Sequence, residues 1–78
     1  MSIQIKIKGN GFAIVDNETI ECYIKDFPNV DVMKELNEIR SYMDCNPQKR
    51  KATCSGVKKF CWLWLRNVNN NEQLKIKL

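Results

Sequence analysis

Residues 41–66 read SYMDCNPQKRKATCSGVKKFCWLWLR, and this stretch contains the signals that decide the fold of the second half of the chain. A proline disfavours α geometry in the residue before it, so Asn46-Pro47 ends a helix that arrives from the N-terminal side. Thr53 or Ser55 can cap a new helix, because a hydroxyl oxygen accepts a free amide N–H of the first turn. We therefore expect two helices joined by a short polar connector.

Apolar residues recur at helical spacing on both sides of this connector. The pattern before it, which Asn29 or Asp31 can cap, contains Val32, Leu36, Ile39 and Met43. The pattern after it contains Val57, Cys61, Trp64 and Val68, with Phe60 and Leu65 beside them. Three asparagines at 69–71 are expected to break this second pattern. Residues 29–71 are therefore predicted to form a two-helix hairpin with a basic connector.

The N-terminal part of the chain has the two-residue period of β-strands. Ile3, Ile5 and Ile7 alternate with polar residues, and the sequence Gly-Asn-Gly at 9–11 then supplies a tight turn. The strands predicted after this turn cover residues 12–15 and 19–24, with a second turn at Asp16-Asn17 and a stop at Pro28. Residues 1–28 are thus predicted to form a three-stranded antiparallel β-meander.

Residues 72–78 alternate again and could add a short C-terminal fourth strand. The predicted fold class is α+β, with the β-meander followed by the helical hairpin in a single domain over residues 1–78. A chain of 78 residues buries only a thin core.

The composition indicates a globular protein, at 44% hydrophobic and 28% charged residues. No apolar run approaches the roughly 20 residues that span a membrane. Met1–Lys6 alternates in polarity, unlike the apolar stretch of a signal peptide. We therefore expect a cytoplasmic protein with no membrane partner, in which four cysteines are reduced thiols: Cys22, Cys45, Cys54 and Cys61.

The same sequence argues against catalysis, a metal site and a cofactor. It contains no histidine to act as a general base near neutral pH. The cysteines form no Cys-x-x-Cys pair, and the glycine turn at 9–11 is too short to cradle a phosphate. We expect no enzymatic activity.

Charge is divided unequally between the two halves of the chain. Residues 1–45 contain five basic and eight acidic residues, whereas residues 46–78 contain eight basic residues and Glu72 alone. Net charges of −3 and +7 give the overall +4. Such a division favours an anionic partner for the second half, although charged residues are also ordinary solvated surface.

The candidate nucleic-acid-binding residues are the cations around the connector and on the second helix: Lys49, Arg50, Lys51, Lys58, Lys59 and Arg66. Trp62 and Trp64 lie two residues apart on a helix and point about 200° away from each other. Trp64 aligns with the core positions. Trp62 is either exposed, where it could stack on a base, or packs against the sheet or Tyr42. Trp62 and Tyr42 are the candidate partner anchors.

Residues 41–66 resemble a segment near the C-terminal end of phage and prophage replication proteins of the replisome-organiser or helicase-loader-associated kind. That segment reads Trp-Leu-x-x-Asn-Pro-x-Lys-Arg-Lys-Thr, followed by a basic-Gly-hydrophobic-x-basic-Phe pattern and a terminal Trp-Leu. The residues in register are Asn46, Pro47, Lys49, Arg50, Lys51, Thr53, Gly56, Val57, Lys59, Phe60, Trp64 and Leu65. Tyr42-Met43 replaces Trp-Leu, and Cys54-Ser55 replaces residues that are usually basic.

The resemblance covers about a third of the chain and implies a phage or mobile-element origin, hence the cytoplasm of a bacterial host. It also implies a replication-linked or DNA-associated role, without transferring an activity. Three functions follow as hypotheses. The first is a non-catalytic protein that binds nucleic acid or a nucleic-acid-processing complex. The second is an inhibitor of a host nucleic-acid enzyme, of the anti-CRISPR or anti-restriction type. The third is an oligomer-forming domain.

Overall fold

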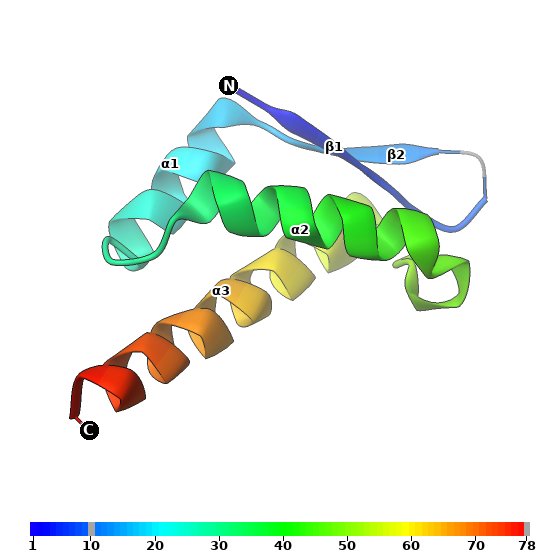
Figure 1. The fold of residues 1–78 in the computed structure, drawn as a ribbon. Helices are drawn as coiled ribbons and strands as arrows, with labels where there is room; N and C mark the ends of the chain where they lie inside the picture. Colours follow the sequence, from blue (N-terminus) through cyan, green and yellow to red (C-terminus); the bar gives the residue numbers. More distant parts are fainter. Residues whose placement is uncertain (10, 78) are drawn as a thin grey trace.

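The computed structural model describes residues 1–9 and 11–77, with side chains up to residue 71. Two strands come first, and helices make up the rest of the chain (Figure 1). The elements are β1 (Ile3–Lys6), β2 (Phe12–Val15), α1 (Asn17–Asp26), α2 (Val32–Cys45), the short 3-10 helix η1 (Pro47–Lys49) and α3 (Cys54–Lys77). The β-hairpin lies along α2 and α3, with β1 against α2 and β2 against α3.

The hairpin buries one face, as the two-residue period of a strand requires. The antiparallel register pairs Ile3 with Val15 and Ile5 with Ala13, and all four side chains are buried. The turn between the strands contains Gly9 at φ 83°, a left-handed conformation that glycine adopts without a steric penalty.

The predicted third strand at residues 19–24 is wrong, because this segment belongs to α1. Alternating Ile20, Cys22 and Ile24 suggested a strand, but Cys22 and Ile24 are exposed. The buried residues are Ile20, Tyr23 and Phe27, which follow the period of a helix. Asp16, expected in a turn, is the N-cap of α1, since its carboxylate accepts the Thr19 amide at 3.0 Å.

The predicted two-helix hairpin is also wrong, because three helices follow the sheet. α2 lies where the apolar spacing predicts a helix, and α3 begins beside Thr53, whose hydroxyl accepts the Gly56 amide at 3.1 Å. α3 continues through the asparagines at 69–71, since asparagine costs a helix under about 0.7 kcal/mol per residue and neither glycine nor proline follows.

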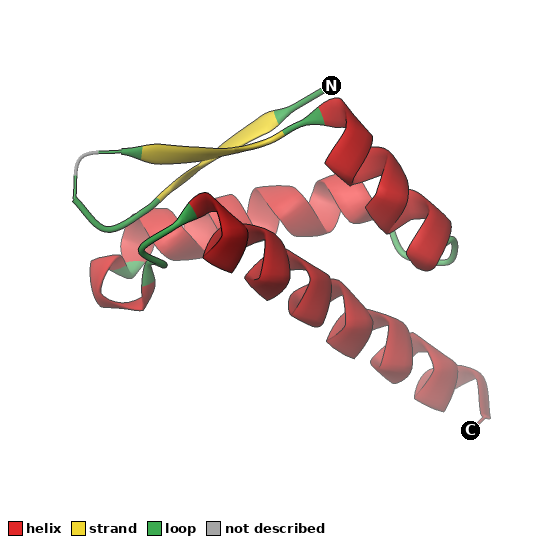
Figure 2. Ribbon diagram, turned by 180° about the vertical axis from the view of Figure 1, so that it is seen from behind, coloured by secondary structure: helices red, strands yellow, loops and turns green. Residues whose placement is uncertain are grey.

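The predicted fourth strand over 72–78 is therefore wrong as far as Lys77, where the backbone is helical, and Leu78 lies outside the described residues. Viewed from two sides, the C-terminal part of α3 extends beyond the other elements (Figure 2). Among the described residues, α3 included, no helix has the combination of length and apolar character that crossing a bilayer requires.

The core lies between the hairpin and the two long helices, and α1 closes one end of it. α2 contributes Leu36, Ile39 and Met43, and α3 contributes Val57, Cys61 and Leu65. All six of these side chains are fully buried. The core positions of α3 recur at i, i+4 and i+8, so the opposite side of this helix faces away from the rest of the molecule.

Candidate functional site

The connector between α2 and α3 provides hydrogen-bond donors for the last carbonyl groups of α2. The last carbonyl groups of a helix have no partner within it. Asn46 donates its side-chain amide to the Tyr42 carbonyl oxygen at 2.8 Å. Arg50 donates Nε to the Met43 carbonyl oxygen at 2.9 Å and Nη2 to that of Asp44 at 3.2 Å. The guanidinium of Arg50, which was predicted to contact phosphate, therefore stabilises the end of α2.

The next residue, Lys51, approaches the first turns of α3. Its ammonium group lies 5.0 Å from the centre of the Phe60 ring, a cation–π contact. Gly56 allows this approach, because a Cβ at that position would lie 3.3 Å from Cβ of Lys51. Five residues line the hollow that results, which has a volume of about 280 Å³ and is called the α3 pocket below: Lys51, Gly56, Lys59, Phe60 and Leu63.

Lys59, Leu63 and Arg66 recur at i, i+4 and i+7 on α3 and are all exposed, opposite the buried core positions. The Arg66 guanidinium lies 5.9 Å from the centre of the Trp62 ring. Together with Lys51, these residues form a surface that we call the basic α3 face: Lys51, Lys59, Leu63 and Arg66. The α3 pocket is its N-terminal part.

The structure does not place all the predicted cations on this face. Lys49 is exposed on η1, in the connector. Lys58 lies on the side of α3 that faces α1, where its carbonyl oxygen accepts the Tyr23 hydroxyl at 2.8 Å. The pKa of Asp16 lies below its ordinary value, mainly through its hydrogen bonds from Thr19, with a smaller contribution from the Lys58 charge.

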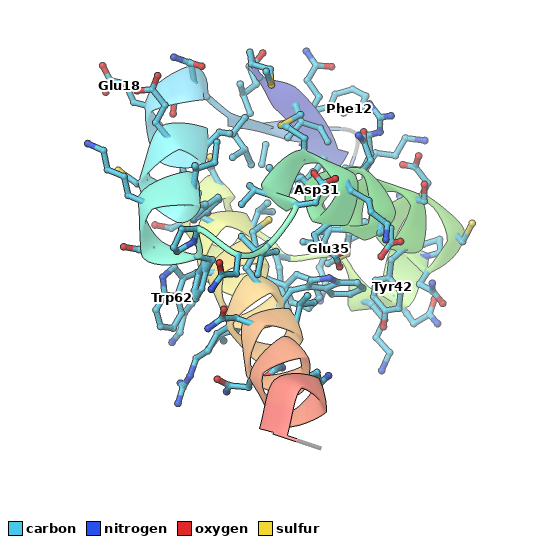
Figure 3. The ribbon with its side chains drawn as sticks, turned by 60° about the vertical axis from the view of Figure 1, so that its left-hand side comes forward. Phe12, Glu18, Asp31, Glu35, Tyr42 and Trp62 are labelled. Carbon is cyan, nitrogen blue, oxygen red and sulfur yellow. The ribbon has the colours of Figure 1, made fainter. Side chains whose placement is uncertain are left out.

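The two tryptophans lie on different sides of α3. Trp62 packs on Phe27 with ring centres 5.5 Å apart, and its indole N–H donates to Oδ2 of Asp26 at 3.1 Å. It remains 36% exposed, between α1 and the basic α3 face. Figure 3 shows Trp62 on one side of α3 and Tyr42 on the other.

Trp64 packs against α2, where its indole N–H donates to Oε1 of the buried Glu35 at 3.0 Å. Its ring lies 5.9 Å from the rings of both Tyr42 and Phe60. Tyr42 is thus a half-buried member of an aromatic cluster between α2 and α3, which leaves Trp62 as the more accessible of the two candidate anchors.

Most carboxylates of the acidic half are engaged within the molecule. Asp16 and Asp31 cap helices, and Glu21 accepts the Asn17 amide. Asp26 and Glu35 accept the two indole N–H groups. Asp44 lies 3.8 Å from Lys6, in the single ion pair found among the described side chains. The cations of the basic α3 face have no carboxylate within ion-pairing distance in that same part of the chain.

Cys61 and Tyr23 are buried, whereas the thiols of Cys22, Cys45 and Cys54 are exposed. Burial raises the pKa of the Cys61 thiol to about 12, so this residue is a protonated member of the core at neutral pH. Burial likewise raises the pKa of the Tyr23 hydroxyl, which stays a hydrogen-bond donor. Within residues 1–9 and 11–71, no three cysteine or carboxylate side chains come together as metal ligands would.

The sequence predictions missed two features of this region. The backbone N–H of Lys8 donates to the Lys51 carbonyl oxygen at 2.9 Å, which brings the end of the hairpin beside the connector. Lys6 and Arg50 then line a second hollow of about 210 Å³ with Phe12. Only the tertiary fold shows this proximity. Leu63 was missed too, although its position four residues after Lys59 could have identified it.

No protein-family model, curated protein or solved structure matches the chain.

Proposed function

We propose that this protein binds nucleic acid, without catalysing a reaction on it, through the basic α3 face. One observation carries the proposal. Lys51, Lys59 and Arg66 have no carboxylate partner among the described side chains, whereas most carboxylates are engaged by helix termini, indoles or Lys6. Unpaired cations on one face attract a polyanion, and the release of its condensed counterions drives binding.

The apolar groups around these cations also suit nucleic acid. Leu63 is 40% exposed between Lys59 and Arg66, and Trp62 borders the same face. A surface that combines cations with flat or apolar side chains can hold phosphates and bases together. The resemblance of residues 41–66 to phage replication proteins supports the same proposal and suggests a phage or mobile-element origin.

The alternative, an inhibitor that imitates phosphates with its carboxylates, is less well supported. Asp26, Asp31 and Glu35 make intramolecular hydrogen bonds. Glu18 and Glu38 are exposed and lie on different helices, α1 and α2. A complex with a nucleic-acid enzyme in the absence of DNA or RNA would favour this alternative.

Fluorescence anisotropy with short labelled single-stranded and double-stranded DNA tests the proposal. The test variant reverses two exposed charges of the basic α3 face, Lys59→Glu and Arg66→Glu (K59E/R66E). The matched control is K34E/R40E, which reverses one lysine and one arginine on the exposed surface of α2. Both variants change the net charge equally, so a difference between them reports the position of the charges.

We expect the unmodified protein to bind and K59E/R66E to lose most of its affinity, while K34E/R40E keeps it. If about three phosphates are neutralised on a single strand, log K falls with log salt at a slope of about −2, and a fourfold rise in salt weakens binding about 20-fold. The test variant should lower the size of this slope by about 1 to 2. Equal loss in both variants, or no binding at low salt, would overturn the proposal.

A further inference from the structure

The wall of the α3 pocket is mostly apolar, although cations surround it. Phe60 and Leu63 contribute apolar side chains to the wall, and Gly56 allows the side chain of Lys51 to lie close to the start of α3. Leu63 is 40% exposed on α3, whereas Val57, Cys61 and Leu65 of the same helix are fully buried. A partner that covers this wall with an apolar surface would therefore gain from desolvating it.

Two ammonium groups lie beside this apolar wall. Lys51 and Lys59 both line the pocket, and no carboxylate does. The ammonium group of the half-buried Lys51 lies over the Phe60 ring, and its aliphatic stem adds to the wall. A ligand that matches this arrangement has a flat apolar part next to an anionic part.

We infer that the α3 pocket takes one unpaired nucleobase, with its neighbouring phosphates on Lys51 and Lys59, so that this protein prefers single-stranded nucleic acid to duplex. The inference rests on the proposed function and adds the class of ligand. The volume of about 280 Å³ lies just below the roughly 300 to 1,000 Å³ of pockets that enclose small molecules, which suits a single base.

The apolar wall of the α3 pocket favours binding of single strands over duplexes. In a duplex the faces of the bases are stacked on each other, and only their edges are presented in the grooves. Phe60 and Leu63 have no hydrogen-bonding groups with which to read those edges. An unpaired base offers its face, and stacking on an apolar or aromatic side chain contributes to affinity whatever the base.

The test compares labelled oligonucleotides of equal length and charge: oligothymidylate, oligouridylate and a strand of abasic sugar-phosphate units. Abasic units keep every phosphate and remove every base. We expect both base-carrying strands to bind about tenfold more tightly than the abasic strand, in keeping with the stacking of about one base.

Leu63→Ala should reduce the preference for base-carrying strands several-fold and leave binding of the abasic strand unchanged. Ile24→Ala, which truncates another exposed aliphatic residue, on α1, should leave both unchanged. Equal affinity for the abasic and thymidylate strands would overturn the inference while the proposed function stands. Failure of every strand to bind would overturn the proposed function itself.

Discussion

The guanidinium of Arg50 caps the C-terminal end of α2, the helix that precedes it in the chain. Its donors reach the carbonyl oxygens of Met43 and Asp44, two of the last groups in α2 that lack a partner within the helix. Asn46 does the same for the Tyr42 carbonyl oxygen. Asn46 and Arg50 of the connector are thus accounted for by helix capping, independently of any ligand.

Arg50→Met should lower the free energy of unfolding by about 1 to 2 kcal/mol, because it removes two hydrogen bonds from a charged donor. Arg50→Lys should recover little of this loss, since an ammonium group lacks the planar fork that reaches both carbonyl oxygens. Urea unfolding followed by circular dichroism measures both variants. If Arg50→Met unfolds at the same urea concentration as the unmodified protein, the capping role is wrong.

Asp16 gives a prediction about pH. Its pKa is lowered in the folded protein by hydrogen bonds from Thr19, so its ionised form stabilises the fold above the ordinary value of 3.8. That contribution is lost as the pH falls through the lower folded pKa. Asp16→Asn cannot titrate at this position. The stability of the unmodified protein relative to Asp16→Asn should therefore be constant from pH 6 to 8 and decrease below about pH 4.

Thermal unfolding of both proteins across this pH range measures the difference. If the difference in stability between the two proteins stays constant down to the lowest pH at which both fold, the helix cap does not lower the pKa of Asp16 in the folded protein.

At the scale of elements, one hydrogen bond joins α3 to α2 inside the aromatic cluster. Trp64→Phe removes the indole N–H and leaves the buried Glu35 carboxylate without that donor, which should cost about 1 to 3 kcal/mol of unfolding free energy. Trp62→Phe should cost less than about 1 kcal/mol, because exposed Asp26 regains water as a partner. Urea unfolding of the two variants measures their free energies of unfolding.

The double variant Trp64→Phe/Glu35→Met checks the cause. Replacing both partners with apolar groups should recover part of the stability lost in Trp64→Phe alone. A double variant that is less stable than the single one would mean that Glu35 supports the fold through something other than the Trp64 indole.

The elements differ in how far the sequence predicts them. The hairpin of β1 and β2 and the position of α2 follow from local periods. α1 does not, because Thr19, Ile20 and Ile24 are β-branched and favour strands, while the helical set of Ile20, Tyr23 and Phe27 is sparse.

Some features of the candidate site can also be predicted from the sequence, and others cannot. The helical spacing of Lys59 and Arg66 is visible in the sequence, and it places both on one exposed face of α3. The capping role of Arg50 and the approach of Lys8 to the connector depend on contacts between distant segments, which no local pattern contains.

At the scale of the molecule, α2 carries charges of both signs, whereas the charged residues of α3 before Glu72 are all basic. On α2, Lys34 and Arg40 each stand four residues before an acid, Glu38 and Asp44, at a spacing that brings side chains together. On α3, no acid lies three or four residues from Lys59. The cations of the basic α3 face therefore repel one another in the free protein, a cost that binding of a polyanion would relieve.

This arrangement predicts opposite effects of the two charge-reversed variants on stability. K59E/R66E, which should lose most of its affinity for nucleic acid, relieves repulsion but also loses the cation–π contact of Arg66 with Trp62, so its stability should stay close to that of the unmodified protein. K34E/R40E places new negative charges four residues before Glu38 and Asp44, where like charges repel, and should be less stable, by about 1 kcal/mol relative to K59E/R66E at low ionic strength. In about 1 M salt, where charges are screened beyond roughly 3 Å, the gap should close. Urea unfolding at both salt concentrations measures it. If K59E/R66E is the less stable variant at low salt, Lys59 and Arg66 stabilise the fold. The loss of nucleic-acid binding in K59E/R66E would then result from unfolding and not from the loss of a contact surface.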